Sequence, residues 1–226
     1  MKKLLLIILL CSGTLAYAQQ VYVETGRNTS HFKFQNNQGE ELENLQSKTK
    51  SYVGAGYKHS LYKGLSLTTG LSYNSYGAIG SDDVVGNFFE WDIDYLGFNL
   101  GLDYDFSITE DVSFYVIATV NAEWMVDGVQ TINDQVFNVK DIEEFNDIAM
   151  FFRSGGGVRF NISEKAQIYA QYLYGSGLAL DDENNSATTE LRINVHSLGV
   201  GVIVDIPCRK KEETPVEGTT TNETQN

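Results

Sequence analysis

Residues 112–126 read Val-Ser-Phe-Tyr-Val-Ile-Ala-Thr-Val-Asn-Ala-Glu-Trp-Met-Val, and this stretch decides the fold class. Every even-numbered residue in it is apolar, whereas the odd positions include Ser113, Thr119, Asn121 and Glu123. Side chains point to alternate faces of a strand, so this period of two predicts a β-strand with one apolar and one polar face. A helix would need a period near 3.6. The sequence therefore predicts an all-β protein.

The same alternation recurs along the chain and predicts eight strands. They cover approximately residues 21–34, 49–60, 65–74, 89–104, 112–126, 150–162, 166–174 and 191–204. Long links alternate with tight turns between them, which predicts an eight-stranded antiparallel up-and-down β-barrel. Two strands change the phase of their apolar residues midway, and we expect a β-bulge near Tyr95 and another near Ser197.

The polar face of the strands indicates what surrounds the barrel. A soluble barrel buries its apolar face, whereas a transmembrane barrel turns that face to lipid. Solvated surfaces are roughly 25–35% charged, yet residues 64–81 and 166–180 carry no charge. Large aromatic residues also gather near both ends of the strands, as the girdles of a lipid-facing band do. We expect a transmembrane barrel; the alternative is a soluble periplasmic lipocalin-like barrel that binds a small apolar ligand.

The two ends of the chain differ from residues 19–206, the expected barrel domain. Residues 1–18 predict a cleaved secretory signal peptide, because Lys2 and Lys3 precede an apolar run that closes with Ala16-Tyr17-Ala18. That run is too short for a spanning helix. Residues 207–226 show no apolar period and predict a disordered tail. Cleavage would leave one cysteine, Cys208, so no intrachain disulfide is expected.

Residues 19–206 resemble the small outer-membrane β-barrel family of Bacteroidetes type, also called PorT-like. The likeness is carried by the signal peptide, the strand at residues 91–104, the turn at residues 107–111 and the closing strand that begins at His196. It implies a barrel exported to the cell outer membrane. Such barrels usually end on an aromatic residue, whereas the last patterned strand here ends at Ile206 and 20 residues follow.

The net charge restricts the partners. With 16 Lys and Arg against 30 Asp and Glu, the formal charge is -14, which excludes nucleic acid as a partner. The acidic residues concentrate in the long links, which we expect to be outer loops; among them are Asp141, Glu143, Glu144, Asp181, Asp182 and Glu183. No EF-hand spacing occurs there, so we expect a solvated acidic rim that selects a protein or surface partner rather than a specific Ca²⁺ site. Outer-membrane lipid is the other expected partner.

The polar strand faces predict charges inside the barrel, where they must pair. If the link at residues 127–149 is a symmetric hairpin, Glu123 lies opposite Arg153, and we predict an ion pair between them. We expect these and other inward residues to form an interior salt-bridge network rather than an ion pathway, because eight strands leave no aqueous channel. The expected inward residues are Glu24, Lys58, Asp103, Glu123, Arg153, Arg159 and Arg192.

Catalysis has little support in the sequence. The histidines, His31, His59 and His196, are scattered, and no cofactor motif is present. A lipid hydrolase on such a barrel would need a Ser and a His within hydrogen-bond reach. His196 and Ser197 are neighbours in a strand and therefore point to opposite faces. We expect a non-enzymatic protein without a cofactor, serving envelope structure, assembly or surface interaction.

Overall fold

A computed structural model of the chain describes residues 19–35, 45–82, 87–139, 148–178 and 190–206. Within them there is no helix long and apolar enough to cross a membrane. The described residues form strands β1 (Gln19–Gln35), β2 (Leu45–Tyr62), β3 (Leu65–Asp82), β4 (Asn87–Ser107), β5 (Val112–Ile132), β6 (Gln135–Asn138), β7 (Ala149–Ser163), β8 (Ala166–Gly177) and β9 (Glu190–Ile206).

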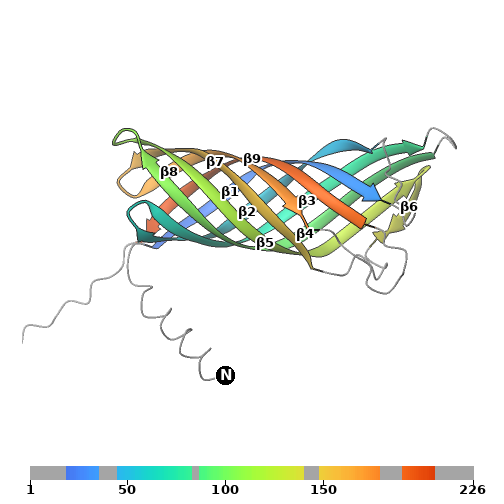
Figure 1. Ribbon diagram of the computed structural model, residues 1–226, viewed down its shortest axis with the longest axis horizontal. Coiled ribbons are helices and arrows are strands. Elements are labelled where there is room, and N and C mark those ends of the chain that lie inside the picture. Colours follow the sequence, from blue (N-terminus) through green and yellow to red (C-terminus); the bar gives the residue numbers. More distant parts are fainter. Residues whose placement is uncertain (1–18, 36–44, 83–86, 140–147, 179–189, 207–226) are drawn as a thin grey trace, which may run out of the picture.

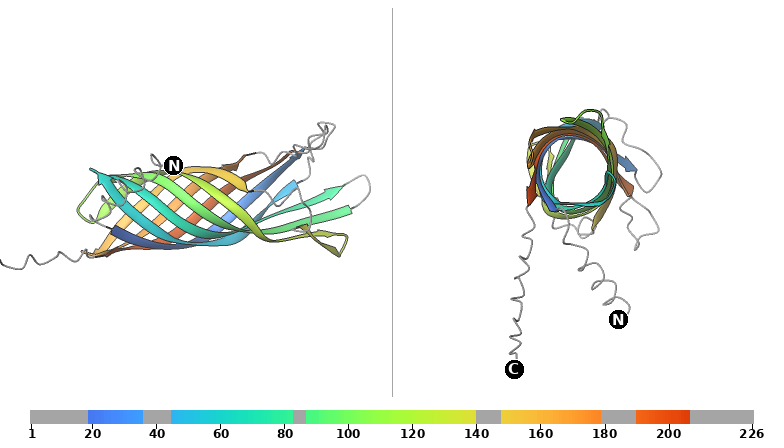
Figure 2. Two further views of the ribbon diagram at one scale, coloured as in Figure 1. Left: turned by 90° about the horizontal axis from the view of Figure 1, so that it is seen from below. Right: turned by 90° about the vertical axis from the view of Figure 1, so that its left-hand side faces the viewer.

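Eight of these strands close into a ring. Each pairs antiparallel with its neighbours in the order β1-β2-β3-β4-β5-β7-β8-β9, and β9 pairs back onto β1. The view along the axis shows the closed ring, and the side view shows the strands tilted around it (Figures 1 and 2). The structure therefore confirms the predicted eight-stranded antiparallel barrel.

The two ends of the barrel differ. The short links at residues 63–64, 108–111 and 164–165, together with the start of β1 and the end of β9, lie at one end, here called the turn end. β1, β3 and β8 end, and β2, β4 and β9 begin, at the opposite end, here called the loop end, on the right in Figure 1. Outer-membrane barrels have short periplasmic turns and longer extracellular loops. The turn end is therefore the periplasmic end.

β5 continues beyond the ring at the loop end and folds back on itself. It pairs with β6 through a tight turn at Asn133 and Asp134, whose φ angles are 48° and 67°. Two consecutive positive φ angles characterise a two-residue hairpin turn, and Asn and Asp tolerate them. The long link expected over residues 127–149 is therefore partly strand, because β5 continues to Ile132 and residues 135–138 form β6.

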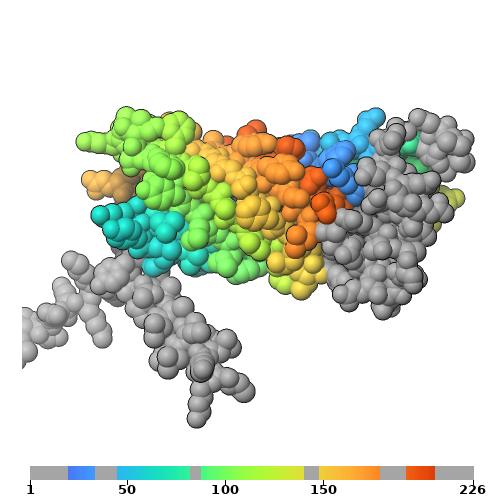
Figure 3. All heavy atoms as spheres, in the orientation of Figure 1, coloured from blue at the N-terminus to red at the C-terminus, as the bar shows by residue number. Residues whose placement is uncertain are grey.

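The ring strands turn apolar side chains outward. In β5, Phe114 and Val116 are 49% and 53% exposed, whereas Tyr115 and Glu123 are buried. A soluble barrel would show the opposite arrangement, so the lipocalin-like alternative is wrong. The space-filling view shows the side chains closing the wall between neighbouring strands along the face that is drawn (Figure 3).

The two phase changes in the sequence have one cause, because Ile93 and Tyr95 of β4 and the corresponding residues of β9 are buried in the same apolar section of the lumen. The β4–β5 pairing does shift register between Asp94 and Tyr95, but the extra residue is Val126 of β5. The register of β9 with both neighbours runs without a shift past Ser197, so the bulge expected there is wrong. Ile193 and Val195 are instead buried inside the barrel. The apolar residues change face because the lumen itself has an apolar section near the loop end.

Candidate functional site

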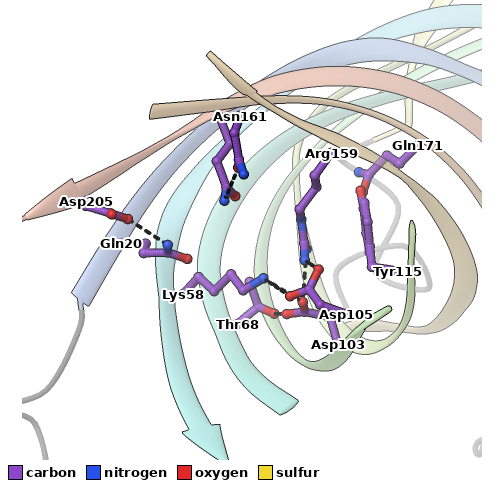
Figure 4. Close-up of polar contacts among 11 residues, drawn as sticks. Gln20, Lys58, Thr68, Asp103, Asp105, Tyr115, Arg159, Asn161, Gln171 and Asp205 are labelled. Carbon is purple, nitrogen blue, oxygen red and sulfur yellow. Dashed lines mark hydrogen bonds and ion pairs between the residues drawn. The ribbon is translucent and has the colours of Figure 1, made fainter. Parts of the chain in front are cut away.

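Four charged side chains form an inner ion cluster in the lumen near the turn end (Figure 4). Lys58 Nζ of β2 lies 2.8 Å from Asp103 and 2.9 Å from Asp105 of β4. Arg159 of β7 lies 2.9 Å from Asp103 and also pairs with Asp105. Its guanidinium carbon stands 3.7 Å from the centroid of the Tyr115 ring. The cluster joins three strands across the lumen, where each buried charge requires a partner.

Sequence reasoning placed Lys58, Asp103 and Arg159 inside the barrel but missed Asp105. Asp105 has the same parity as Asp103 in a strand whose alternation is unbroken between them. Residues of equal parity share a face of a strand. This signal was therefore present in the sequence.

A cavity of about 60 Å³ lies in the middle of the lumen. Glu24 lines it and accepts hydrogen bonds from the Tyr169 hydroxyl and the Gln171 side-chain amide, both at 2.8 Å. The Tyr115 hydroxyl donates to the Gln171 oxygen at 2.8 Å. Ligand sites for drug-sized molecules have volumes of roughly 300–1,000 Å³. This cavity has room for a few waters and not for such a ligand.

An outer ion cluster lies on the loop-end side of this cavity. Arg153 Nη2 donates to Glu123 Oε1 at 2.5 Å and also to the Tyr76 hydroxyl oxygen. The Asn74 side-chain amide donates to the same Glu123 oxygen at 3.0 Å. The Tyr76 hydroxyl donates to Glu123 Oε2 at 2.8 Å. Both carboxylate oxygens of this fully buried glutamate therefore have donors.

The structure brings Glu123 and Arg153 together, but the predicted cross-strand register is wrong. Glu123 pairs with Ala149, and Arg153 pairs with Thr119. The link is asymmetric because β5 leaves β7 after Glu123 and then pairs with β6. Glu123 and Arg153 still meet because both point into the lumen and the long arginine side chain spans the offset.

An apolar core fills the lumen at the loop-end side of the outer ion cluster. Tyr76 belongs to both, and its ring stacks on Phe151 with centroids 5.6 Å apart. The core consists of Phe32, Tyr76, Ala78, Ile93, Tyr95, Ala149, Phe151, Ile193 and Val195. Sequence reasoning missed it because these residues interrupt the polar pattern that marks the lumen elsewhere. Together with the ion clusters, the core obstructs the lumen.

The turn end opens into a polar vestibule of about 330 Å³. Its lining includes Lys58, Asp105 and Arg159 of the inner ion cluster, with Gln20 and Asn161 nearer the mouth. The paired charges of the inner ion cluster therefore form the inner limit of the vestibule.

Arg192 corrects another prediction. It is exposed on the outside of β9, opposite Lys33 of β1, and so does not belong to the interior network. The prediction depended on a change of phase at Ser197, and the strand has none. The predicted acidic-loop residues Asp141, Glu143, Glu144, Asp181, Asp182 and Glu183 lie outside the described residues, as do the signal peptide and the tail.

A lysine cluster joins β2 and β4 at the loop end, beyond the lipid-facing band. Asp92 Oδ1 lies 2.6 Å from the Nζ atoms of both Lys48 and Lys50, and Lys48 also pairs with Glu90 at 2.5 Å. Partial burial raises the pKa of Asp92, but the two lysine partners outweigh it and hold the pKa below its usual range.

The histidines do not form a catalytic group with Ser197. The His196 ring lies outside the barrel, with Nδ1 2.6 Å from the Tyr172 hydroxyl. Ser197 is buried inside and donates to Asn28 at 2.7 Å. In the part of the chain that the structure covers, no three His, Cys, Asp or Glu side chains gather into a metal-binding group.

A closed ring of eight antiparallel strands with an apolar outer face and a filled polar lumen defines an outer-membrane β-barrel. The chain belongs to the outer membrane protein beta-barrel domain family, whose model matches residues 4–203. Membership in this family places the protein in the outer membrane. A comparison with curated proteins finds no match.

Three solved structures illustrate the likeness to other barrels. Neisserial surface protein A is 15% identical, with a TM-score of 0.45 over 80% of this chain and 96% of that chain. The outer membrane protease OmpT from Escherichia coli is 6% identical, with a TM-score of 0.48 over 84% and 97%. OprG from Pseudomonas aeruginosa is 12% identical, with a TM-score of 0.46 over 84% and 98%.

Proposed function

We propose that this protein is a closed, non-enzymatic barrel that serves envelope structure, assembly or surface interaction through its outer loops. The observation that supports this role is the obstructed lumen. From the turn end outward, the vestibule is followed by the inner ion cluster, a cavity of about 60 Å³, the outer ion cluster and the apolar core. A conducting pore needs a continuous aqueous path, and larger barrels provide it.

Conductance in planar lipid bilayers tests the closed lumen. We expect the reconstituted full chain to leave the current at the level of the bare bilayer, while a 16-stranded porin in the same set-up gives steady steps. Stable single-channel steps from the full chain would contradict the proposal.

Turnover assays test the non-enzymatic part. We expect the protein in micelles to leave fluorescent phospholipids and an unstructured peptide intact, because His196 bonds to Tyr172 and Ser197 faces the lumen. Hydrolysis that persists after purification and disappears in His196→Ala would make the protein an enzyme.

The acidic loops are the proposed contact surface. Their charge is tested by a variant with Asp141→Asn, Glu143→Gln, Glu144→Gln, Asp181→Asn, Asp182→Asn and Glu183→Gln. We expect expressing cells to bind positively charged beads less well than cells with the parent chain, with equal recovery of barrel in the membrane. A matched variant at the periplasmic turn, Glu110→Gln with Asp111→Asn, leaves bead binding unchanged. Equal bead binding by the loop variant would contradict the surface role.

Export after cleavage behind Ala18 belongs to the same proposal. The positively charged start, the apolar run and the small residues before Gln19 support it. Intact mass of the protein purified from membranes is expected to match residues 19–226, and a mass for the full 226 residues would contradict it. The resemblance at residues 91–104 and at His196 supports placement in the PorT-like branch of the family.

A further inference from the structure

Basic side chains line the outside of the barrel along β1 and β9 toward the loop end. Arg27 and Lys33 are exposed on β1, with His31 partly exposed between them, and Arg192 and His196 are exposed on β9. Lys33 lies directly opposite Arg192 across the two strands, so the two rows join. These five residues are here called the β1–β9 basic patch. In Figure 3, β1 in blue and β9 in red lie side by side on the face that is drawn.

This wall contrasts with the formal charge of -14 on the whole chain. The flanking strands β2 and β8 contain no carboxylate. In β1 and β9 the acids are Glu24 in the lumen, Asp205 at the turn end and Glu190 at the first position of β9. Among the side chains that the structure describes, which do not include that of Glu190, Arg27 and Lys33 form no ion pair. The described side chains on the outer half of this wall therefore carry an excess of positive charge.

The patch begins where the lipid-facing band ends. Arg27 lies opposite Leu198, which is 65% exposed, and exposed Val23 and Val200 continue the apolar wall below it. His196 lies beside Tyr174 of β8, with ring centroids 5.1 Å apart. Aromatic rings of this kind stand at the boundary between lipid and water. A molecule that fits the wall thus has an apolar part in the band and anionic groups just above it.

We infer that the β1–β9 basic patch binds a phosphorylated glycolipid of the outer leaflet. Its acyl chains lie against Val23, Leu198 and Val200, and its phosphates bind Arg27 and Lys33. A guanidinium holds phosphate through two parallel hydrogen bonds, and an ammonium attracts it as a point charge. Arg27 and Lys33 are six residues apart, about 20 Å along a strand, so the two cations bind separate anionic groups.

A soluble sulfated polymer is the competing ligand. It would satisfy the positive charges but would leave the adjoining apolar wall unused, so the observations favour the lipid. The inference depends on the outer-membrane location that the family gives and not on the proposed role of the acidic loops. A failure of the conductance or bead-binding tests therefore leaves it standing.

Native mass spectrometry of the full chain in detergent tests the site. The probes are bis-phosphorylated lipid A and the same lipid with both phosphates removed. Each Lys or Arg near an anionic lipid surface strengthens binding roughly fivefold, so we expect Arg27→Gln with Lys33→Gln to weaken binding of the phosphorylated lipid about thirtyfold. The control, Lys63→Gln with Lys165→Gln at the turn end, retains the affinity of the parent chain.

Heat-dependent gel mobility of each variant shows that its barrel is closed before its binding is compared. Three results would overturn the inference: equal affinity of the Arg27 and Lys33 variant, equal affinity for the lipid without phosphates, or binding of heparin by the parent chain with no binding of either lipid. The last result would assign the patch to a soluble polyanion.

Discussion

Glu123 is the most constrained charge in the molecule. Its side chain is fully buried, and its two oxygens accept hydrogen bonds from Arg153, Asn74 and Tyr76. Removing one member of a buried ion pair leaves the other charge buried without a partner and lowers stability strongly. Replacing both members by apolar residues of similar volume changes stability much less. The interior network therefore makes the closed barrel depend on each of its members.

Arg153→Met tests this dependence. We expect the free energy of unfolding to fall by about 3–5 kcal/mol, because Glu123 stays buried without its cation. Adding Glu123→Leu should restore part of that loss. Denaturant unfolding in lipid vesicles measures both. The control is Lys165→Met at an exposed turn, which should change the free energy of unfolding by no more than about 0.5 kcal/mol. A loss equal to that of the control would show that the pair is not buried as described.

The inward-facing residues could be predicted from sequence because every second residue of a strand lies on the same face. This rule put Glu123, Arg153 and Arg159 on the inward face correctly, and it would have found Asp105. It failed for Arg192, because a bulge was assumed where Ile193 and Val195 form part of an apolar core inside the barrel. Alternation of polarity cannot separate a bulge from a lumen whose own character changes.

At the scale of elements, β7 depends on close approach to its neighbours. A Cβ added at Gly157 would overlap the backbone oxygen of Ala170 in β8 and come within 2.9 Å of the Tyr115 ring in β5. Tyr115 has little freedom to move, because Arg159 stands over its ring and its hydroxyl bonds to Gln171. The sequence Gly155-Gly-Gly157 therefore allows β7 to lie against both neighbours.

Gly157→Val is expected to lower the free energy of unfolding by about 1–3 kcal/mol through overpacking. Ala118→Val adds similar bulk on the exposed lipid-facing side of β5 and should be nearly neutral. The temperature at which the folded gel band disappears compares the two. Equal temperatures for both variants would contradict the close packing of β7.

The lysine cluster between β2 and β4 makes the loop end sensitive to acid. Because the pKa of Asp92 is lower in the folded protein than in the unfolded chain, its contribution is present above about pH 4 and is lost as the pH falls through the folded pKa. Asp92→Asn should therefore be slightly less stable at neutral pH, by about 1 kcal/mol or less since the group is partly exposed. Near pH 2 the two proteins should have the same melting temperature. A difference that persists in acid would assign the effect to something other than ionisation.

The connections between elements were harder to predict than the elements. Asn133 and Asp134 are a recognisable signal for a hairpin turn. The strand that follows, β6, has only four residues, which is too few to show a clear alternation of apolar and polar residues, so it was not predicted. The observed register of β5 with β7 therefore differs by four residues from that of a symmetric hairpin, because Glu123 pairs with Ala149 and not with Arg153. Local periodicity identifies strands, whereas register depends on which partner a strand keeps at its end.

At the scale of the whole molecule, the apolar outer face of the strands is the face that meets lipid. Val116→Arg would place a charge on the exposed face of β5, at a cost of about 2–4 kcal/mol near the middle of the membrane. We expect much less barrel in the outer membrane. Glu110→Arg, at an exposed turn outside the band, is the control and should insert normally.

Thr119→Arg tests the opposite face. Thr119 lines the small central cavity and is paired with Arg153, so a second cation there would meet both crowding and like charge. We expect loss of the folded barrel. An unperturbed fold would mean that the odd-numbered face of β5 meets solvent.

The most direct test of the lipid-facing closed barrel is fractionation of expressing cells, followed by gel mobility of the membrane fraction with and without boiling in detergent. We expect the protein in the outer-membrane fraction, with a mobility that shifts on heating because the unboiled barrel stays closed. Recovery in the soluble periplasmic fraction, or a single mobility under both conditions, would contradict the account.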